Sequence, residues 1–176
     1  MESEGNCQVI SSQKQVLIFD CGSQGKSKNK RIIEKIVKIC KGKEVTLIIS
    51  HPHQDHFNLL NKIFFELILK KSRISKVIIG GNESFALEKM KLKENNFEGG
   101  EKEEFSIVEH LQNKEISVLF TWLCKTENLE MLENEFALGD LRWRIISPIM
   151  IKIPSRLSES QMNDPNLMCI MIKLYP

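Results

Sequence analysis

Residues 50–56 read Ser-His-Pro-His-Gln-Asp-His, a segment that holds three of the four histidines in the chain and one of its four aspartates. With these residue frequencies, a given HxHxDH pattern arises by chance with a probability of about 5 × 10⁻⁵, an estimate obtained by counting matches to a template. Three imidazoles packed together for purely structural reasons would also disfavour one another's protonation. The clustering therefore indicates a chemical role for this segment.

The segment lies between an apolar run typical of a buried strand, residues 45–50, and an apolar stretch typical of a helix, residues 57–71. In α/β folds this junction lies at the carboxyl edge of the sheet, where functional side chains gather. His51 and His53 point to the same side of an extended backbone, and Asp55 is a candidate N-cap of the helix. Imidazole and carboxylate ligands suit zinc, iron(II) or manganese, so the segment predicts a metal site.

Strand and helix signals alternate along the chain before and after this segment and give way to strand signals toward its end. The pattern predicts strands at 7–12, 16–20, 45–50, 76–80 and 116–120, helices at 29–43, 57–71 and 84–97, a strand-turn-strand unit at 127–148 and a last strand at 167–175. The polar stretch 98–114 fits neither pattern, and 149–166 is typical of a loop. We expect one layered α/β or α+β domain over residues 1–176.

The composition fits a single globular domain, with 176 residues, 41% of them hydrophobic, and a net charge of +2. The basic runs at 26–31 and 89–93 are most simply solvated faces. No GxGxxG, GxxxxGK[ST] or GxSxG motif occurs, so the sequence does not support a nucleotide-binding loop or a serine hydrolase. Trp122 and Trp143 are expected in packing rather than in a cleft.

Five cysteines without any CxxC pair indicate free, mostly buried thiols in a reducing compartment: Cys7, Cys21, Cys40, Cys124 and Cys169. The polar N-terminus, MESEGNCQ, does not resemble a signal peptide. The apolar stretches are too short for a transmembrane segment. These features predict a cytoplasmic location.

SHPHQDH resembles the HxHxDH signature of the metallo-β-lactamase fold superfamily. The flanks agree: VLIFDCGSQG (16–25) is similar to the strand, Asp and Gly turn that precede this signature. EGNCQVI (4–10), LGDLRWRIISP (138–148) and NDPNLMCIMIKL (163–174) resemble segments of the hydrolase domains in the competence DNA-uptake subgroup. The resemblance covers about residues 4–175.

This resemblance implies an αββα sandwich with one or two metal ions, zinc by preference and iron or manganese otherwise. His51 and His53 would bind one ion, Asp55 and His56 the second, and Asp20 would orient a ligand histidine. A metal-bound hydroxide would attack a phosphodiester, ester, thioester or amide, with Asp55 as the catalytic residue that orients it or accepts its proton. The substrate would be a small molecule or a nucleic-acid phosphodiester.

The sequence departs from the family pattern after His56. The family uses a third histidine, a bridging aspartate and a final histidine, whereas His110 is the only histidine left here and lies in a polar context. Asp140 and Asp164 read as turn residues. The resemblance therefore predicts an incomplete domain whose C-terminal strands are missing, with a sheet edge at 167–175 that a partner or the missing segment would complete. Two functions stay open: an active metal-dependent hydrolase, or an inactive, truncated domain acting as a binding module.

Overall fold

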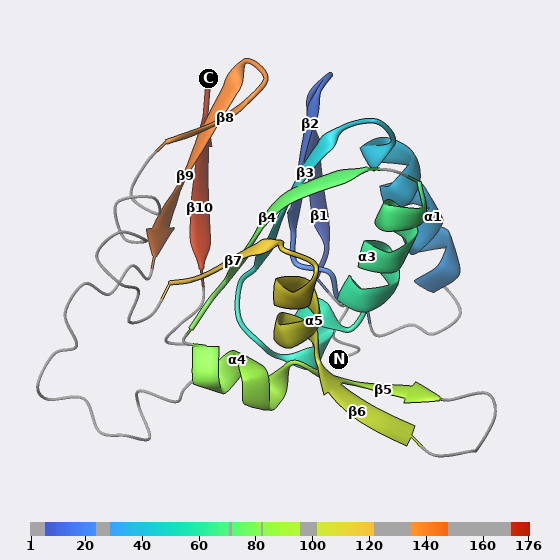
Figure 1. The fold of residues 1–176 in the computed structure, drawn as a ribbon. Coiled ribbons are helices and arrows are strands. Elements are labelled where there is room, and N and C mark those ends of the chain that lie inside the picture. Colours follow the sequence, from blue (N-terminus) through green and yellow to red (C-terminus); the bar gives the residue numbers. More distant parts are fainter. Residues whose placement is uncertain are drawn as a thin grey trace, which may run out of the picture.

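The computed structural model describes residues 6–23, 29–70, 72–81, 83–95, 102–121, 135–147 and 170–176. Its helices and strands follow one another as β1 (Gln8–Ser11), β2 (Gln15–Phe19), α1 (Asn29–Cys40), β3 (Glu44–Ile49), α2 (Gln54–Phe57), α3 (Leu60–Leu69), β4 (Arg73–Ile79), α4 (Glu83–Lys89), β5 (Lys91–Asn95), β6 (Lys102–Ser106), α5 (Ile107–Asn113), β7 (Ser117–Phe120), β8 (Phe136–Leu138), β9 (Leu141–Ser147) and β10 (Met171–Tyr175) (Figure 1). The chain is a mixed α/β protein.

A five-stranded mixed sheet in the order β1-β2-β3-β4-β7 forms the centre of the molecule. Strands β2, β3, β4 and β7 run parallel, and β1 pairs antiparallel with β2. Val45, Leu47 and Ile49 are fully buried on one face of β3, and Ile48 is fully buried on the other. A strand buried on both faces needs a continuous apolar run, which the sequence has at residues 45–49.

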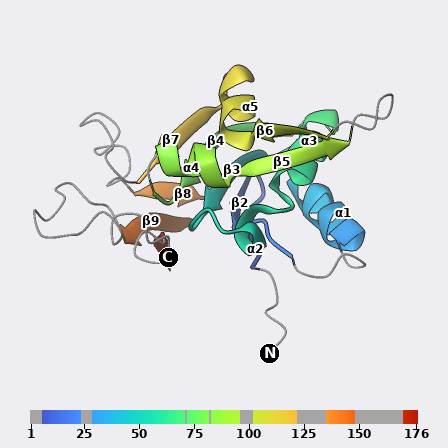
Figure 2. The same ribbon diagram turned by 90° about the horizontal axis from the view of Figure 1, so that it is seen from below.

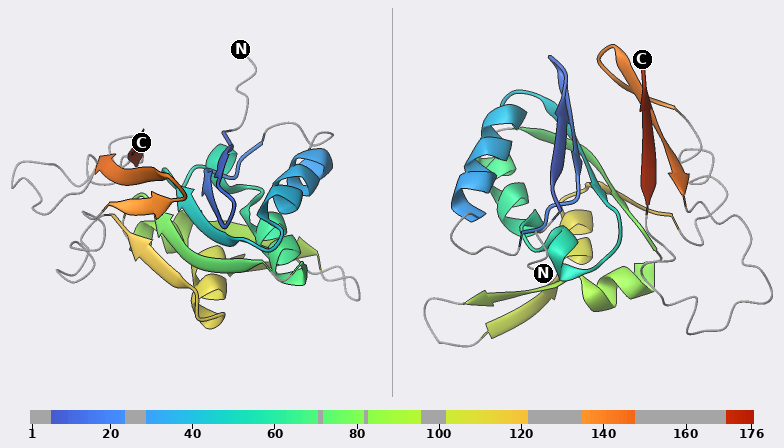
Figure 3. Two further views of the ribbon diagram at one scale, coloured as in Figure 1. Left: turned by 90° about the horizontal axis from the view of Figure 1, so that it is seen from above. Right: turned by 180° about the vertical axis from the view of Figure 1, so that it is seen from behind.

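Helices cover one face of this sheet. Helix α1 buries Ile33, Ile36, Val37 and Cys40 at helical spacing, and α3 buries Leu60, Ile63, Phe64 and Leu67. Buried residues of α4 and α5 join the same apolar cluster. The structure therefore has a helix layer on this side of the sheet (Figures 1 and 3).

A second, three-stranded antiparallel sheet in the order β10-β9-β8 packs on the other face. Trp143 and Ile145 of β9 are buried against Leu17 and Ile48 in one cluster, and Trp143 stacks on Phe136 with ring centroids 4.3 Å apart. The expectation that Trp143 serves packing is confirmed, while Trp122 lies outside the described residues. The layers thus run helices, sheet, sheet (Figure 3).

The outward side of the three-stranded sheet is basic. Because Trp143 and Ile145 point into the core, Arg142 and Arg144 point away from it. The register places Lys173 of β10 directly opposite Arg144. Like charges directly opposite each other in a sheet are destabilising.

The predicted helix at 84–97 is wrong in its second half. Helix α4 ends at Lys89, and β5 then pairs antiparallel with β6, with Lys91 opposite Ser106. The undecided stretch 98–114 holds β6 and α5. The predicted helix at 57–71 is interrupted, since α2 ends at Phe57 and α3 begins at Leu60. Of the predicted unit 127–148, β8 and β9 are described, and the loop 149–166 lies outside the described residues.

The described cysteines, Cys7, Cys21 and Cys40, are free thiols. Burial, with the nearby charge of Asp20, raises the pKa of the Cys7 thiol to about 11, so this group stays protonated at neutral pH. Cys124 and Cys169 lie outside the described residues. In the part of the chain that the structure describes, no helix is long and apolar enough to cross a membrane.

Candidate metal centre

The histidine segment begins where β3 ends, at the carboxyl edge of the parallel strands. Ser50 follows β3 directly, and its carbonyl accepts a hydrogen bond from the Ile170 N–H just before β10 (2.8 Å). His53 is the N-cap of α2, with extended backbone angles and no side-chain cap. The predicted N-cap role of Asp55 is therefore wrong, because the helix already starts at Gln54. Figure 2 shows α2 next to the ends of β2 and β3.

His51 and His53 lie on the same side, as predicted, but across a bend closed by the hydrogen bond that the His53 N–H donates to the His51 carbonyl (2.9 Å) rather than along an extended backbone. The Nε2 atom of His51 is 3.0 Å from the Nδ1 atom of His53. Zinc–nitrogen bonds of about 2.05 Å in a tetrahedral site put two ligand nitrogens about 3.3 Å apart. The two nitrogens stand at hydrogen-bonding distance, which is also close to the separation of a pair of zinc ligands.

Asp20, which follows β2 directly, binds Ser50 and His56 of the histidine segment. Its Oδ1 accepts from the Ser50 N–H (2.7 Å) and its Oδ2 from the Ser50 hydroxyl (2.9 Å). The Nδ1 atom of His56 lies 2.7 Å from the same Oδ2. Asp20 is only 2% exposed and has a φ of 59°, a left-handed conformation that aspartate tolerates better than most residues.

One arrangement of protons satisfies these contacts. His56 donates Nδ1–H to Asp20, the Ser50 hydroxyl donates to Asp20, and His51 donates Nδ1–H to the Ser50 Oγ, 3.1 Å away. This arrangement leaves a lone pair on the Nε2 atom of both His51 and His56. Fixing a histidine tautomer through its other ring nitrogen is what protein groups do around metal-binding histidines.

The second pair of candidate ligands is Asp55 and His56. The Oδ2 atom of Asp55 is 3.6 Å from the Nε2 atom of His56. The Nδ2 atom of Asn6 approaches the same Nε2 to 3.3 Å. The rings of His51 and His56 lie 4.0 Å apart between centroids. The structure therefore brings all four predicted metal ligands together, and their binding of metal stays a prediction.

The environments of His51 and His56 move their pKa values in opposite directions. Burial, with His56 and His53 nearby, lowers the pKa of His51 to about 4. Burial also works to lower the pKa of His56, but the hydrogen bond to Asp20 and the charges of Asp20 and Asp55 outweigh it, so this pKa is raised above 6.5. His51 is thus neutral at physiological pH, as a metal ligand must be, whereas a proton competes with metal for His56 at a higher pH than it does for His51.

Tight backbone contacts fix the segment against the loop after β2. A Cβ atom on Gly22 would meet the Asp55 carbonyl oxygen at 1.4 Å, so only glycine fits there. The Cys21 N–H donates to the His56 carbonyl (2.6 Å). The Asn58 side chain clamps Ser23, accepting from its N–H (3.0 Å) and donating to its carbonyl (2.7 Å). These contacts fix the position of the loop after β2, which begins at Asp20, relative to the histidine segment.

His110 lies on α5, half-buried, with its ring edge-on to Phe64 of α3 at 5.5 Å between centroids. That position belongs to the helix layer, and the predicted role of His110 as third ligand stays a prediction. The described strand ends beside the histidine segment carry Gly80 and Gly81 after β4 and Thr121 after β7. Asp140 lies in the turn between β8 and β9, as predicted, and Asp164 is outside the described residues.

Asn6 and Ser50 are site residues that the sequence alone did not reveal. Asn6 lies 50 positions from His56 in sequence, so its contact with the Nε2 atom follows only from the fold. Ser50 is the first residue of the quoted segment, but its link to Asp20 requires β2 and β3 to be neighbours. The EGNCQVI resemblance is the one signal that could have pointed to Asn6.

The ligands stand as two pairs rather than as one complete set. Within the described residues, no group of three or more His, Cys, Asp or Glu side chains is arranged to hold one metal ion. A catalytic zinc normally takes three protein ligands and a water molecule. Each pair would thus need a further ligand.

No protein-family model matches the chain, and no curated protein matches it. The class that the fold defines is the broad one, a mixed α/β protein with two facing sheets and a helix layer. The site consists of three neighbouring imidazoles, one of which, His56, is hydrogen-bonded to the buried carboxylate of Asp20.

Proposed function

We propose that this chain is a metallo-β-lactamase-fold domain that binds one or two metal ions through residues 50–56 and hydrolyses a phosphodiester, ester, thioester or amide. The observation that carries the proposal is the 3.0 Å separation between the Nε2 atom of His51 and the Nδ1 atom of His53. Zinc is the preferred ion, and iron or manganese would suit the same nitrogen and oxygen ligands.

The fold supports the proposal. The order helices, sheet, sheet accounts for three of the four layers of an αββα sandwich. The histidine segment lies at the carboxyl edge of the parallel strands, where this class of fold carries its chemistry. The layer arrangement and the signature therefore both support the proposal.

The donor set fits a metal ion. His51 and His53 would hold one ion, Asp55 and His56 would hold the other, and Ser50 and Asp20 would orient the rings through their Nδ1 atoms. The chemistry that a bound zinc ion supplies is polarisation of the scissile group and a water molecule of lowered pKa. The chain's own contribution is to fix the orientation of the imidazole rings through the hydrogen bonds of Ser50 and Asp20.

Asp55 is the residue we propose as catalytic. Its side chain is half-buried and its Oδ2 atom lies 3.6 Å from the Nε2 atom of His56. A carboxylate in this position is placed to orient an attacking water molecule or to accept its proton. Asp20 is nearly fully buried and acts on His56 rather than on a substrate.

The alternative function is a binding module without catalysis. It is favoured by the two-plus-two division of the ligands, since within the described residues neither pair has the third protein ligand of a catalytic zinc. Such a domain would keep the signature and the fold while binding metal weakly.

Metal content and turnover separate the two functions. We expect the purified protein to carry one or two equivalents of zinc, iron or manganese by plasma mass spectrometry, and a His51→Ala/His53→Ala double variant to lose metal. Asp140→Ala, in an exposed turn, is the control for Asp55→Ala. Chelator-sensitive hydrolysis of bis(p-nitrophenyl) phosphate, lost in Asp55→Ala, would support the hydrolase.

Other outcomes are equally informative. Weakly bound metal without turnover on phosphodiester, ester, thioester and amide probes supports the binding module. Protein without tightly bound metal, and with no turnover above a chelated control, overturns the hydrolase. Loss of metal in His110→Ala would identify His110 as the third ligand.

A further inference from the structure

Helices α1 and α3 expose large apolar side chains on the outer side of the helix layer. Phe65 and Leu69 are 60% and 61% exposed, and Ile68 and Ile39 are 44% and 39% exposed. The two helices contact each other, so these side chains belong to one outer surface, which we call the α1–α3 face. A contiguous group of exposed apolar side chains marks an interaction site. The exposed side of α3 therefore needs an explanation.

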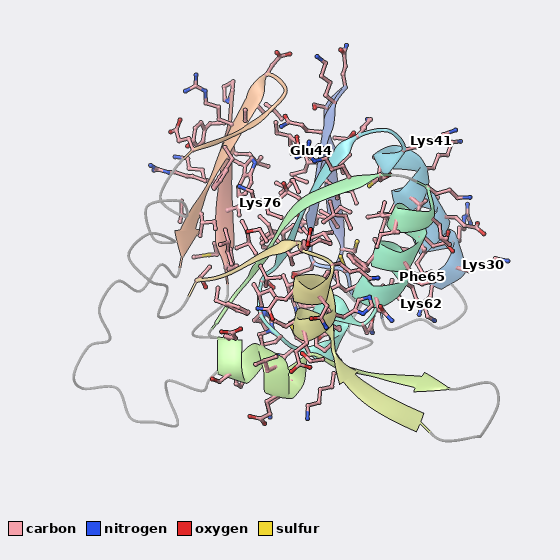
Figure 4. The ribbon with its side chains drawn as sticks, in the orientation of Figure 1. Lys30, Lys41, Glu44, Lys62, Phe65 and Lys76 are labelled. Carbon is pink, nitrogen blue, oxygen red and sulfur yellow. The ribbon has the colours of Figure 1, made fainter. Side chains whose placement is uncertain are left out.

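The same face is strongly basic. The two helices, each counted with the residue that follows it, carry seven lysines and arginines against two glutamates: Lys30, Arg31, Lys35, Lys38, Lys41, Lys62 and Lys70 against Glu34 and Glu66. This gives a net charge of +5, whereas the whole chain carries only +2. Figure 4 shows Lys30, Lys62 and Phe65 on the same side of the molecule.

We propose that the α1–α3 face docks on an anionic lipid surface. Exposed apolar side chains surrounded by lysines match an interfacial helix, in which the apolar groups enter the acyl boundary and the basic groups meet anionic headgroups. Each lysine or arginine near such a surface contributes attraction, and the six lysines and one arginine on these two adjacent helices add up.

Charge and composition favour lipid over the other occupants. Lysine is depleted at protein–protein interfaces, yet six of the seven basic residues of this face are lysines. A nucleic-acid backbone would be attracted by the lysines but would gain nothing from Phe65, Ile68 and Leu69. A lipid surface uses both the charge and the apolar side chains.

This inference is independent of the proposed metal chemistry. The α1–α3 face is on the outer side of the helix layer, whereas the histidine segment lies at the ends of the strands beside α2 (Figure 2). Substitutions on the face therefore test docking alone.

A tryptophan placed at position 65 reports insertion directly. In Phe65→Trp, vesicles containing phosphatidylserine should shift the added fluorescence to shorter wavelength, and lipids brominated on the acyl chain should quench it. Vesicles of phosphatidylcholine alone should do neither. The matched control is Ile146→Trp, an exposed apolar position 49% accessible on the three-stranded sheet, two residues after Arg144 of its basic surface.

Binding variants separate the apolar and the charged contributions. Phe65→Ser/Leu69→Ser should abolish quenching and weaken vesicle cosedimentation. Lys35→Glu/Lys38→Glu should lower affinity for anionic vesicles by at least about twentyfold, given roughly fivefold per lysine, while Lys173→Glu on the opposite sheet should leave it unchanged. All these positions are exposed, and circular dichroism checks folding.

Three results would overturn the proposal. One is equal shifts in Phe65→Trp and Ile146→Trp. Another is binding to anionic vesicles that the double serine variant leaves intact, since this would mean charge attraction without insertion. The third is a face occupied by a second copy of the chain, seen as a dimer that Phe65→Ser/Leu69→Ser dissociates and that excludes vesicles.

Discussion

The Nδ1 atom of His56 lies 2.7 Å from the Oδ2 atom of Asp20, across 36 positions of sequence. This contact joins the end of β2 to α2 and sets which nitrogen of His56 faces outward. The carboxylate is nearly fully buried and also receives both Ser50 donors. The orientation of Ser50 and His56 in the candidate metal centre therefore depends on Asp20.

Asp20→Asn should keep the backbone, because asparagine also adopts a positive φ readily, but its amide would face the donors of His56 and Ser50. We expect a loss of about 1–3 kcal/mol of unfolding free energy for each buried donor left unsatisfied. The pKa of His56 should fall, because the hydrogen bond and charge that raise it are removed. Urea denaturation and an NMR titration of the ring measure the two effects. Asp140→Asn is the control, and an unchanged His56 pKa would refute the assigned role.

Metal affinity should fall on acidification from a pH above 6.5. Metal and proton compete for His56, whose pKa is raised, so its protonation opposes binding first. His51 adds its own competition only near pH 4, because its pKa is lowered to about that value. Zinc titrations against a competing chelator at several pH values measure the onset. In Asp20→Asn the onset should move to lower pH, and an onset that does not move would contradict the scheme.

Gly22→Ala should disrupt the site. The added Cβ would stand 1.4 Å from the Asp55 carbonyl oxygen, so the loop after β2 must separate from α2. We expect a cost of at least about 3 kcal/mol, the upper range for overpacking, together with weaker metal binding. Gly42→Ala is the matched control, since Gly42 has a φ of 71° and open space around its Cβ position, which leaves a cost of about 1–2 kcal/mol for the left-handed backbone. Equal costs in urea denaturation would argue against the close approach.

Trp143→Ala should weaken the packing between the two sheets and lower the free energy of unfolding. Trp143 is 3% exposed and stacks on Phe136, so we expect a loss of about 3–5 kcal/mol. Trp143→Phe keeps an aromatic ring on Phe136 and should lose less. Leu141→Ala, at an exposed position on the same strand, should have little effect. Thermal denaturation of the three variants gives the ranking, and a small loss in Trp143→Ala would mean that the second sheet packs weakly.

Local periodicity was enough to predict the central elements. The strands β2, β3 and β4 and the helix α1 follow from apolar runs and helical spacing within each segment. The error at 84–97 arose because β5 exists through its pairing with β6, and the residues that pair are not local in sequence. The break after α2 coincides with contacts of Asn58 and Leu59 to Ser23 and Cys21, which are distant in sequence.

In the candidate site, too, local spacing was predictable from the sequence, whereas contacts between distant segments were not. Spacing alone indicated that His51 and His53 share a side, and the structure shows their nitrogens 3.0 Å apart. The contact of Asn6 with His56 depends on how β1 and α2 meet, which no single segment encodes. The position of His110 also depends on packing, since it is fixed by the contact of α5 with α3.

The cross-strand pair of Arg144 and Lys173 has a consequence for the purified protein. Among the described strands, β10 is an outer strand of its sheet, and Lys173 is its central residue. A second copy joined edge to edge in antiparallel register would gather two lysines and two arginines at the join. Salt screens such repulsion, so stocks kept in dilute buffer should stay dispersed, and added salt should promote clustering at this edge.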